Sequence, residues 1–352
     1  MSNQSRNHRN LAKPVKLYFN RCFSTTPITI KMFLSRPNIH KFQIYISHCC
    51  INDSMQEVAD YFEVEPPLEG KEYVDYCLDF CVKHQIDLFV PRYNVTTLID
   101  YKEDFDRIGV KVMFVGSPEI YQTLESKVKT YEALDNTDII AIPKSFCVNN
   151  YEAFKTAYQE IITMGSSACM KPISGISGNG FKQILETMTE VEELYLTTGF
   201  TIAKARLARI LQDSQEVEPF IVMEYLEGDE YSIDCLANKG ELIRAIPRRK
   251  LDSHRQNIEH SIALMAIAQK LTQKFNLNYL FNIQVKCHKG KVYLIEINTR
   301  MSGGIHKSSL AGVNFLYLAI KLLMGETVTT QEKIRWDFQI SNRENYALSN
   351  LG

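Results

Sequence analysis

The sequence predicts an N-terminal α/β domain with a parallel sheet, followed by an α+β region made of two β-rich lobes. Two observations lead to this fold class. Short apolar runs alternate with helical periodicity in the first part of the chain, which is typical of a parallel sheet covered by helices. After Pro219, strand-like runs dominate. With 352 residues, 45% of them hydrophobic, the chain is long enough for two or more domains.

The N-terminal sheet is expected to contain four apolar strands, at residues 15–23, 42–47, 87–91 and 110–115. Segments 28–34 and 73–83 have helical spacing and would connect them. Three hydroxyl residues, 24–26, precede Pro27, and this pattern is a start signal for a helix. An anion could bind at this strand-to-helix junction, but we expect a plain N-terminal cap.

The second part of the chain mixes both periodicities. The expected elements are helices at 129–134 and 151–164, a strand at 168–172, a polar and mostly helical stretch at 191–211, several strands after 219, and helices at 257–274 and 311–324. The last helix would end at Gly325, because glycine is typical just after a helix C-terminus. From residue 331 the chain is charged and weakly patterned, and we expect a tail.

Composition excludes several functional classes. The formal net charge is −1, so no global field favours nucleic acid or an anionic membrane as a partner. Nine cysteines with no CxxC spacing predict reduced thiols and a cytoplasmic location. The apolar stretch 315–324 contains Lys321 and is too short to span a bilayer. Residues 1–10 are polar and lack the apolar core of a secretory signal, and a disordered tail is expected at 1–12.

A predicted β-hairpin around residues 289–291 gathers oxygen ligands. Glu296 and Asn298 share one strand face, because side chains alternate along a strand. A three-residue turn would place Gln284 opposite Glu296, whereas a two-residue turn would put them on opposite faces. In the first case a carboxylate and two amide oxygens lie beside Arg300 and suit Mg²⁺ that is also held by phosphates. Taken alone, the pattern also fits an ordinary amphipathic hairpin.

A lysine and a glycine-rich loop form the second informative segment. Lys171 ends a strand-like run and supplies a point charge suited to a phosphate. The following loop has bare backbone N–H groups that can face an anion, and its candidate residues are Ser174, Gly175, Ser177 and Gly178. The loop fits neither the GxGxxG nor the GxxxxGK[ST] spacing.

The third segment reads as a strand, a tight turn at Gly228 and a second strand. The end of the first strand, Glu224 to Leu226 with Tyr225 between them, can present backbone N–H and C=O groups to a purine edge. Glu230 begins the second strand, and its carboxylate can accept hydrogen bonds from two ribose hydroxyls.

The order and separation of these three segments resemble the ATP-grasp superfamily, and most of all its carbamoyl-phosphate-synthase-like branch of carboxylate–amine ligases. The resemblance runs from about residue 15 to about residue 325 and is most specific in Glu-x-Asn-x-Arg-x-x-Gly-Gly. The chain departs from the family pattern in having Thr299 where proline is usual. It also has Ser126 where aspartate more often precedes the family's basic residue.

The resemblance implies a role for each candidate residue. Lys171 resembles the lysine that contacts the α- and β-phosphates beneath a flexible loop, here 174–180. Lys127 resembles the basic residue that opens the ATP-binding region, although Lys129 is not cleanly distinguished from it. The other counterparts are Glu224, Tyr225 and Leu226 at the adenine, Glu230 at the ribose, Gln284, Glu296 and Asn298 as metal ligands, and Arg300 beside the transferred phosphate.

The resemblance also implies an organisation and a reaction. The expected parts are a tail at 1–12, a pre-ATP-grasp α/β domain at 13–117, a central lobe with the phosphate-binding loop at 118–218, a C-terminal lobe with the metal site at 219–330, and a tail at 331–352. ATP with Mg²⁺, or alternatively Mn²⁺, would drive ligation of a small-molecule carboxylate to an amine through an acyl phosphate. The oligomeric state stays open, with a homodimer as one alternative.

Other functions remain open at this point. The chain could phosphorylate another acceptor, carboxylate one through an acyl phosphate of bicarbonate, ligate an amino acid to a protein or peptide, or bind ATP as a non-catalytic regulatory module. The intact set of Lys171, Glu296, Asn298 and Arg300 argues against the last. The basic cluster 248–250 is either a clamp for the acceptor carboxylate or a solvated turn. His306 is expected at the surface.

Overall fold

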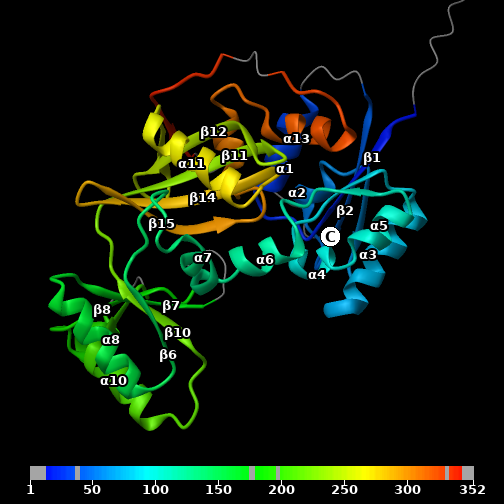
Figure 1. Cartoon of the computed structure of the whole chain (residues 1–352). Coiled ribbons are helices and arrows are strands. Elements are labelled where there is room, and N and C mark those ends of the chain that lie inside the picture. Colours follow the sequence, from blue (N-terminus) through cyan, green and yellow to red (C-terminus); the bar gives the residue numbers. More distant parts are fainter. Residues whose placement is uncertain (1–12, 36–39, 174–178, 196–198, 330–332, 343–352) are drawn as a thin grey trace, which may run out of the picture.

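The computed structural model describes residues 13–35, 40–173, 179–195, 199–329 and 333–342. These residues form three β-sheets, each with its own helices (Figure 1). The expected phosphate-loop residues Ser174, Gly175, Ser177 and Gly178 lie outside the described residues, and so do the segments 1–12 and 343–352.

The N-terminal domain is a parallel sheet in the order β3-β2-β1-β4-β5, which confirms the predicted fold class. Its strands are β1 (Val15–Asn20), β2 (Phe42–His48), β3 (Tyr61–Val64), β4 (Leu88–Val90) and β5 (Lys111–Val112). Its helices are α1 (Thr26–Leu34), α2 (Asp53–Gln56), α3 (Gly70–His84), α4 (Val95–Ile99) and α5 (Lys102–Arg107). The edge strand β3 has a short and only partly buried pattern, so its sequence signal was too weak to predict it.

Buried aromatic rings fix the centre of this sheet. Tyr18 on β1 stacks between Phe80 of α3 and Phe89 of β4, with ring centroids 4.2 and 4.5 Å apart. Its hydroxyl lies 2.6 Å from Ser47 Oγ on β2, so the buried polar atom is satisfied. The helix that follows β1 begins without the expected cap, because Thr25 is at the N-cap position but its side chain makes no capping hydrogen bond.

The central lobe is a smaller sheet in the order β6-β10-β7-β8-β9, set apart with α8 and α10 at the lower left of Figure 1. Its strands are β6 (Ser145–Val148), β7 (Ala168–Pro172), β8 (Lys182–Leu185), β9 (Thr201–Ala203) and β10 (Phe220–Glu224). The helices of this part of the chain are α6 (Pro118–Leu124), α7 (Lys127–Leu134), α8 (Tyr151–Thr163), α9 (Glu190–Leu194) and α10 (Lys204–Asp213). The short strand β9 interrupts the stretch that was expected to be mostly helical.

The C-terminal sheet has the order β15-β14-β11-β12-β13-β16. Its strands are β11 (Asp229–Asn238), β12 (Glu241–Lys250), β13 (Arg255–Ile258), β14 (Tyr279–His288), β15 (Lys291–Asn298) and β16 (Phe338–Ser341). The accompanying helices are α11 (Ile262–Lys274), α12 (Ile305–Ser309) and α13 (Phe315–Met324), the last ending at Gly325 with φ +90° as predicted.

Two expectations for this lobe are corrected. The helix predicted from residue 257 begins only at Ile262, because Ser261 caps it and the preceding residues form β13. The expected tail after residue 331 contributes β16, which pairs with β13 and packs Phe338 and Ile340 against the core. Two alternating apolar residues in a polar context gave too weak a signal to predict a strand.

The β14–β15 hairpin reaches the expected register in an unexpected way. The connection has two residues, Lys289 and Gly290, both with positive φ (+46° and +76°), so the expected three-residue turn is wrong. Such a turn alone would place Gln284 and Glu296 on opposite faces. A β-bulge puts one extra residue, Ile295, on β15, and Gln284 therefore pairs with Glu296 as predicted.

Among the described residues, no helix combines the length and the apolar composition needed to cross a membrane.

Of the glycines in the described ranges, Gly228 should tolerate a side chain least. Its φ is +109°, and an added Cβ would lie 2.2 Å from the Cys287 carbonyl oxygen. We expect Gly228→Ala to lower the free energy of unfolding by about 3 kcal/mol, from backbone strain plus overpacking. Gly165 has φ +74° with open space around it, so Gly165→Ala should cost only the strain, about 1–2 kcal/mol. Urea unfolding measures both, and equal losses would contradict the predicted clash.

Candidate functional site

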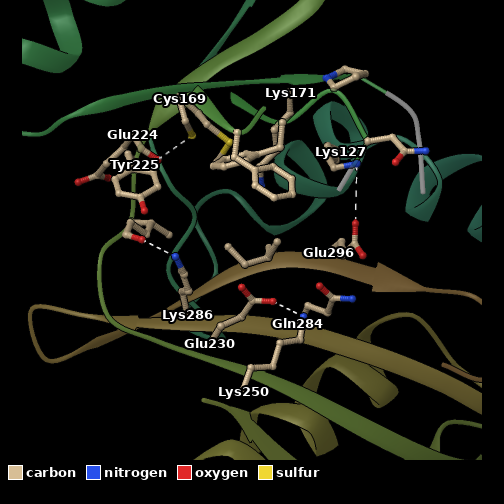
Figure 2. A pocket seen from close by; sticks show the side chains of 17 residues that line it. Lys127, Cys169, Lys171, Glu224, Tyr225, Glu230, Lys250, Gln284, Lys286 and Glu296 are labelled. Atoms are coloured by element: carbon tan, nitrogen blue, oxygen red, sulfur yellow. Dashed lines mark hydrogen bonds and ion pairs between the residues drawn. The ribbon is translucent and has the colours of Figure 1, made fainter. Parts of the chain in front are cut away.

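A cavity of about 380 Å³ lies between the sheet of the central lobe and the C-terminal sheet. Figure 2 shows Lys171 and Lys127 on one side, facing Glu230, Gln284 and Glu296 on the other. Of the candidate residues that the structure describes, the following line this cavity: Lys127, Lys171, Glu224, Tyr225, Leu226, Glu230, Gln284 and Glu296. Three segments that are far apart in the sequence therefore meet at one place.

The connection from β10 to β11 forms one end of the cavity. The N–H of Glu224 donates to Lys144 O (2.9 Å) and that of Tyr225 to Ser167 O (2.7 Å), which fixes the backbone. Lys286 donates to Leu226 O at 2.7 Å. Within the described chain, the Leu226 N–H makes no hydrogen bond, so one backbone donor remains for the edge of a planar ring.

The two lysines differ in their surroundings. Lys171 is partly buried on β7, and burial lowers its pKa, with a further lowering contribution from Lys127. Lys127 begins α7 and its Nζ lies 3.8 Å from Glu296 Oε2. Lys129 is exposed and its N–H bonds to the Ser126 cap, so the cavity distinguishes Lys127 from Lys129.

The oxygen-bearing side chains of the hairpin lie together. Gln284 and Glu296 are cross-strand partners and both line the cavity. Asn298 donates from Nδ2 to Glu296 Oε1 at 2.9 Å, which leaves the Asn298 Oδ1 free to turn toward a cation. One carboxylate and two amide oxygens form a set that fits Mg²⁺, with room for phosphate oxygens in the adjoining cavity.

Glu230 is paired across the sheet with Lys250, which also lines the cavity. Sequence reasoning weighed Lys250 only as part of a basic cluster and did not identify Lys286. Lys286 is two residues from Gln284 on the same strand and therefore shares its face. Strand alternation could have identified Lys286 as a cavity residue.

Arg300 lies just beyond β15, where the C-terminal lobe meets the N-terminal domain. It approaches Glu125 only to 4.0 Å, and its guanidinium carbon lies 5.6 Å from the centre of the Phe23 ring. The guanidinium carbon of Arg92 lies 4.8 Å from the centre of the same Phe23 ring. Arg92 also donates from Nη1 to Met301 O at 3.0 Å.

Arg92 was not identified from the sequence, and it is a buried cation. Only 5% of its surface is exposed, and its Nε has no hydrogen-bond partner among the described residues. Burial lowers its pKa to about 9, and the nearby charge of Arg300 acts in the same direction. The residue follows the carboxyl end of β4, and ligand sites of parallel sheets lie at that edge.

The solvated turn considered for residues 248–250 is wrong. These residues end β12, and Arg248 is buried with only 2% of its surface exposed. Arg248 pairs with buried Asp234 at 2.9 Å and also donates to Ser302 Oγ (3.2 Å) and Ser308 Oγ (2.9 Å). The guanidinium thus holds the turn that follows Arg300.

His306 was expected to be an ordinary surface histidine, and the structure corrects this. It is half-buried at the start of α12, and burial lowers its pKa, with Lys307 and Arg248 contributing. The preceding two glycines gave no sign that the chain turns back toward the core at this point.

Comparisons with known proteins agree with this geometry. A family model described as ATP-grasp in the biosynthetic pathway with Ter operon matches residues 216–346. The arginine-specific carbamoyl phosphate synthase large chain of Geobacillus stearothermophilus is 23% identical over 304 residues, which cover 81% of this chain but 27% of that protein. The chain therefore spans about a quarter of the length of this relative.

Solved structures with a similar fold include N5-carboxyaminoimidazole synthetase from Staphylococcus aureus, with a TM-score of 0.65, 12% identity, and 92% and 81% of the two chains covered. Another is the biotin carboxylase domain dimer of Hydrogenobacter thermophilus 2-oxoglutarate carboxylase, in complex with MgADP, ADP and bicarbonate. Its TM-score is 0.63, with 14% identity over 92% of this chain and 73% of that one. The predicted ATP-grasp fold and the resemblance to carbamoyl phosphate synthases are confirmed.

The buried pair of Asp234 and Arg248 should matter more to stability than the neighbouring exposed pair. We expect Arg248→Met to lower the free energy of unfolding by about 3–5 kcal/mol, because it leaves the Asp234 carboxylate buried without its counter-ion. Arg249 is partly exposed and pairs with Glu259, so Arg249→Met should cost about 1 kcal/mol or less.

Denaturant unfolding of both variants tests this difference. The double change Asp234→Leu with Arg248→Met should recover much of the loss, since the uncompensated charge is removed. If Arg248→Met and Arg249→Met lowered the free energy of unfolding equally, Asp234 would not depend on Arg248 for its charge compensation.

Proposed function

We propose that this chain, an ATP-grasp protein by fold and homology, is an ATP- and Mg²⁺-dependent ligase that joins a carboxylate to an amine. One observation carries the proposal: two lysines, a hinge with a free backbone N–H, and Gln284 and Glu296 of the hairpin line one cavity, and Asn298 bonds to Glu296 at its edge. Arg300 follows the same strand and lies toward the N-terminal domain.

In this function the cavity binds ATP with its base at the hinge. The Leu226 N–H donates to the purine edge. Glu230 accepts from the ribose hydroxyls, and Lys171 and Lys127 contact the phosphates. These cations are held in place before the nucleotide arrives, so little reorganisation is needed when charge develops during transfer.

Gln284, Glu296 and Asn298 would hold Mg²⁺, which when bound neutralises charge on the phosphates. The chain's own residues do the remaining work. Asn298 orients Glu296 through its Nδ2, and Lys127 lies 3.8 Å from the other carboxylate oxygen. Both contacts restrict the Glu296 side chain to the edge of the cavity.

The reaction proceeds in two steps. An oxygen of the substrate carboxylate attacks the γ-phosphorus, the bond to the β-phosphate bridging oxygen breaks, and ADP leaves. The amine then attacks the carbonyl carbon, the C–N bond forms, inorganic phosphate leaves, and the amine loses a proton. Phosphorylation is required because a free carboxylate repels nucleophiles and has no leaving group. Arg300 stabilises the negative charge near the transferred phosphoryl group.

We place the substrate acid at the junction between Arg300 and the N-terminal domain. Arg92 is a buried cation whose Nε lacks a partner in the described chain, and it shares the Phe23 ring with Arg300. An anion between the two guanidinium groups would relieve their repulsion. The start of α1, where Thr25 leaves the helix end uncapped by its side chain, adds a favourable dipole.

A carboxylase acting through an acyl phosphate of bicarbonate is the second candidate. A structural relative binds bicarbonate, and a small anion would fit between two arginines equally well.

The same relative is a dimer, which makes a homodimer one alternative for this chain. Size-exclusion chromatography would distinguish a monomer from a homodimer.

Lys171 should be required for nucleotide affinity. Lys171→Met should weaken ATP binding about ten- to hundredfold, the worth of one or two charge-assisted hydrogen bonds. Lys129→Met is the matched control, because that lysine is exposed outside the cavity, and it should bind ATP as the wild type does. Calorimetry measures both, with circular dichroism to confirm folding. Equal affinity in the two folded variants would refute the phosphate role of Lys171.

The ATP affinity should also depend on pH through Lys171. Burial lowers the pKa of Lys171, and the phosphates favour its protonated form. Affinity is therefore full below the lowered pKa of the free protein and falls as the pH rises through it. The Lys171→Met variant should lack this component, and wild-type binding should take up protons in that window. Calorimetry in buffers of different ionisation enthalpy measures the uptake, and a wild-type-to-variant difference that stays constant with pH contradicts it.

Hydroxylamine should trap the acyl phosphate as a hydroxamate when the correct acid, ATP and Mg²⁺ are present. Screening a panel of acids, with bicarbonate included, should give acid-dependent ADP release in the wild type. Glu296→Gln should still bind ATP but release no ADP, because it keeps the shape and loses the charge at the metal.

The other functions give different products. A kinase would release ADP and leave a stable phosphorylated acceptor. Activity with bicarbonate alone would favour the carboxylase. ATP binding without acid-dependent ADP across the panel would reject the ligase in favour of a regulatory module.

A further inference from the structure

Three consecutive residues at the carboxyl end of β2 bring soft metal-ligating atoms together. A ring nitrogen of His48 and the sulfur atoms of Cys49 and Cys50 all lie within 4.8 Å of one another. No other group of three histidine, cysteine or acidic side chains among the described residues meets this condition. The trio is in the N-terminal domain and takes no part in the ATP cavity.

The backbone on both sides of this trio is fixed. The Glu65 N–H donates to His48 O at 2.8 Å, and Ser47 Oγ donates to the Glu65 carboxylate at 2.7 Å. On the far side, Asn52 caps α2 by accepting from Met55 N at 3.2 Å. The ligand-bearing segment is therefore held between a strand and a capped helix.

The side chains are available for a ligand. Cys49 and Cys50 are exposed free thiols, whereas five other cysteines are buried. His48 is half-buried, and its Nδ1 has no hydrogen-bond partner among the described residues, although the atom itself is buried. The His48 ring therefore has no competing hydrogen bond at Nδ1.

The chemistry of the donors selects the ion. Thiolate and imidazole ligands favour Zn²⁺ and Cu⁺, whereas Mg²⁺ requires oxygen ligands. Tetrahedral zinc, with bonds of about 2.0–2.3 Å, brings its ligand atoms to roughly 3.3–3.8 Å from one another. Rotation of two exposed thiols can close the remaining gap. The oxygen set at Gln284, Glu296 and Asn298 therefore does not compete for the same metal.

We propose that His48, Cys49 and Cys50 bind one thiophilic metal ion, Zn²⁺ in the test below, with the fourth coordination position open to water or an exogenous ligand. Binding releases the two thiol protons, and each sulfur then forms one bond to the metal with no change in oxidation state. The site lies at the carboxyl edge of the parallel sheet, the side on which such domains bind ligands.

Cobalt titration of the reduced full-length chain tests this proposal. Excess Mg²⁺ is present so that the oxygen-ligand site is not available to Co²⁺. One equivalent of Co²⁺ should produce a thiolate-to-cobalt charge-transfer absorption, and Zn²⁺ should displace the cobalt and abolish the band. ATP affinity measured by calorimetry should be the same with and without Zn²⁺, so the outcome is independent of the proposed ligase function.

Variants locate the bound ion. The double change Cys49→Ser with Cys50→Ser should abolish the charge-transfer band, and His48→Ala should weaken Co²⁺ binding about tenfold or more. Cys147→Ser is the matched control, because Cys147 is an exposed free cysteine on β6, and His254→Ala serves likewise for an exposed histidine. Both controls should bind cobalt as the wild type does.

Three results would overturn the proposal. The wild type could take up no cobalt in its reduced form. The double cysteine variant could retain the band, which would place the metal elsewhere. His48→Ala could match the wild type, which would reduce the site to two exposed thiols.

Discussion

Glu296 faces Gln284 because β15 contains one extra residue, and the geometry of the whole cavity depends on that bulge. Tyr131 of α7 donates to the carbonyl of Ile295, the bulged residue, at 3.0 Å. Ala141 pairs with the same strand, accepting from Leu294 N at 2.9 Å. Both contacts come from the segment that precedes the central sheet. The register of the oxygen ligands is thus held by the element that also carries Lys127.

Buried charge has a different effect at each of two places. Asp234 and Arg248 form a buried ion pair within the C-terminal lobe, and the serines around them accept from or donate to both side chains. Arg92 has no such compensation in the described chain. A buried pair mainly fixes a structure, whereas an uncompensated buried cation is costly unless an anion joins it. Arg92 is therefore the buried charge that an anionic ligand would stabilise, whereas the Asp234–Arg248 pair needs no ligand.

Local patterns were sufficient for much of the fold and for part of the site. The alternation of strands and helices predicted the parallel sheet, and strand periodicity placed Glu296 and Asn298 on one face. The bulge at Ile295 left no local signature, so the correct pairing with Gln284 was predicted from the wrong turn. Arg92 was missed because its significance depends on Phe23 and Arg300, which are distant in the sequence.

The same reasoning explains why Arg248 was misread. A run of three basic residues after an apolar strand resembles a solvated turn. The Arg248 guanidinium can be buried because the carboxylate of Asp234 on the neighbouring strand compensates its charge. Charged residues on a central strand can be assigned only when their cross-strand partners are known.

The lysines of the cavity are not equally paired with carboxylates, and a nucleotide phosphate would supply the missing negative charge. Lys250 pairs with Glu230, and Lys127 approaches Glu296, but Lys171 has no carboxylate in ion-pair contact within the described residues. Burial lowers its pKa by removing the charged form from water, and the charges of Glu296 and Glu230 offset this only in part. A phosphate beside Lys171 would raise this pKa again, and the same attraction favours binding of a phosphorylated ligand. The lowered pKa of Lys171 in the free protein and its selectivity for a nucleotide then have one physical origin, the desolvation of its charge.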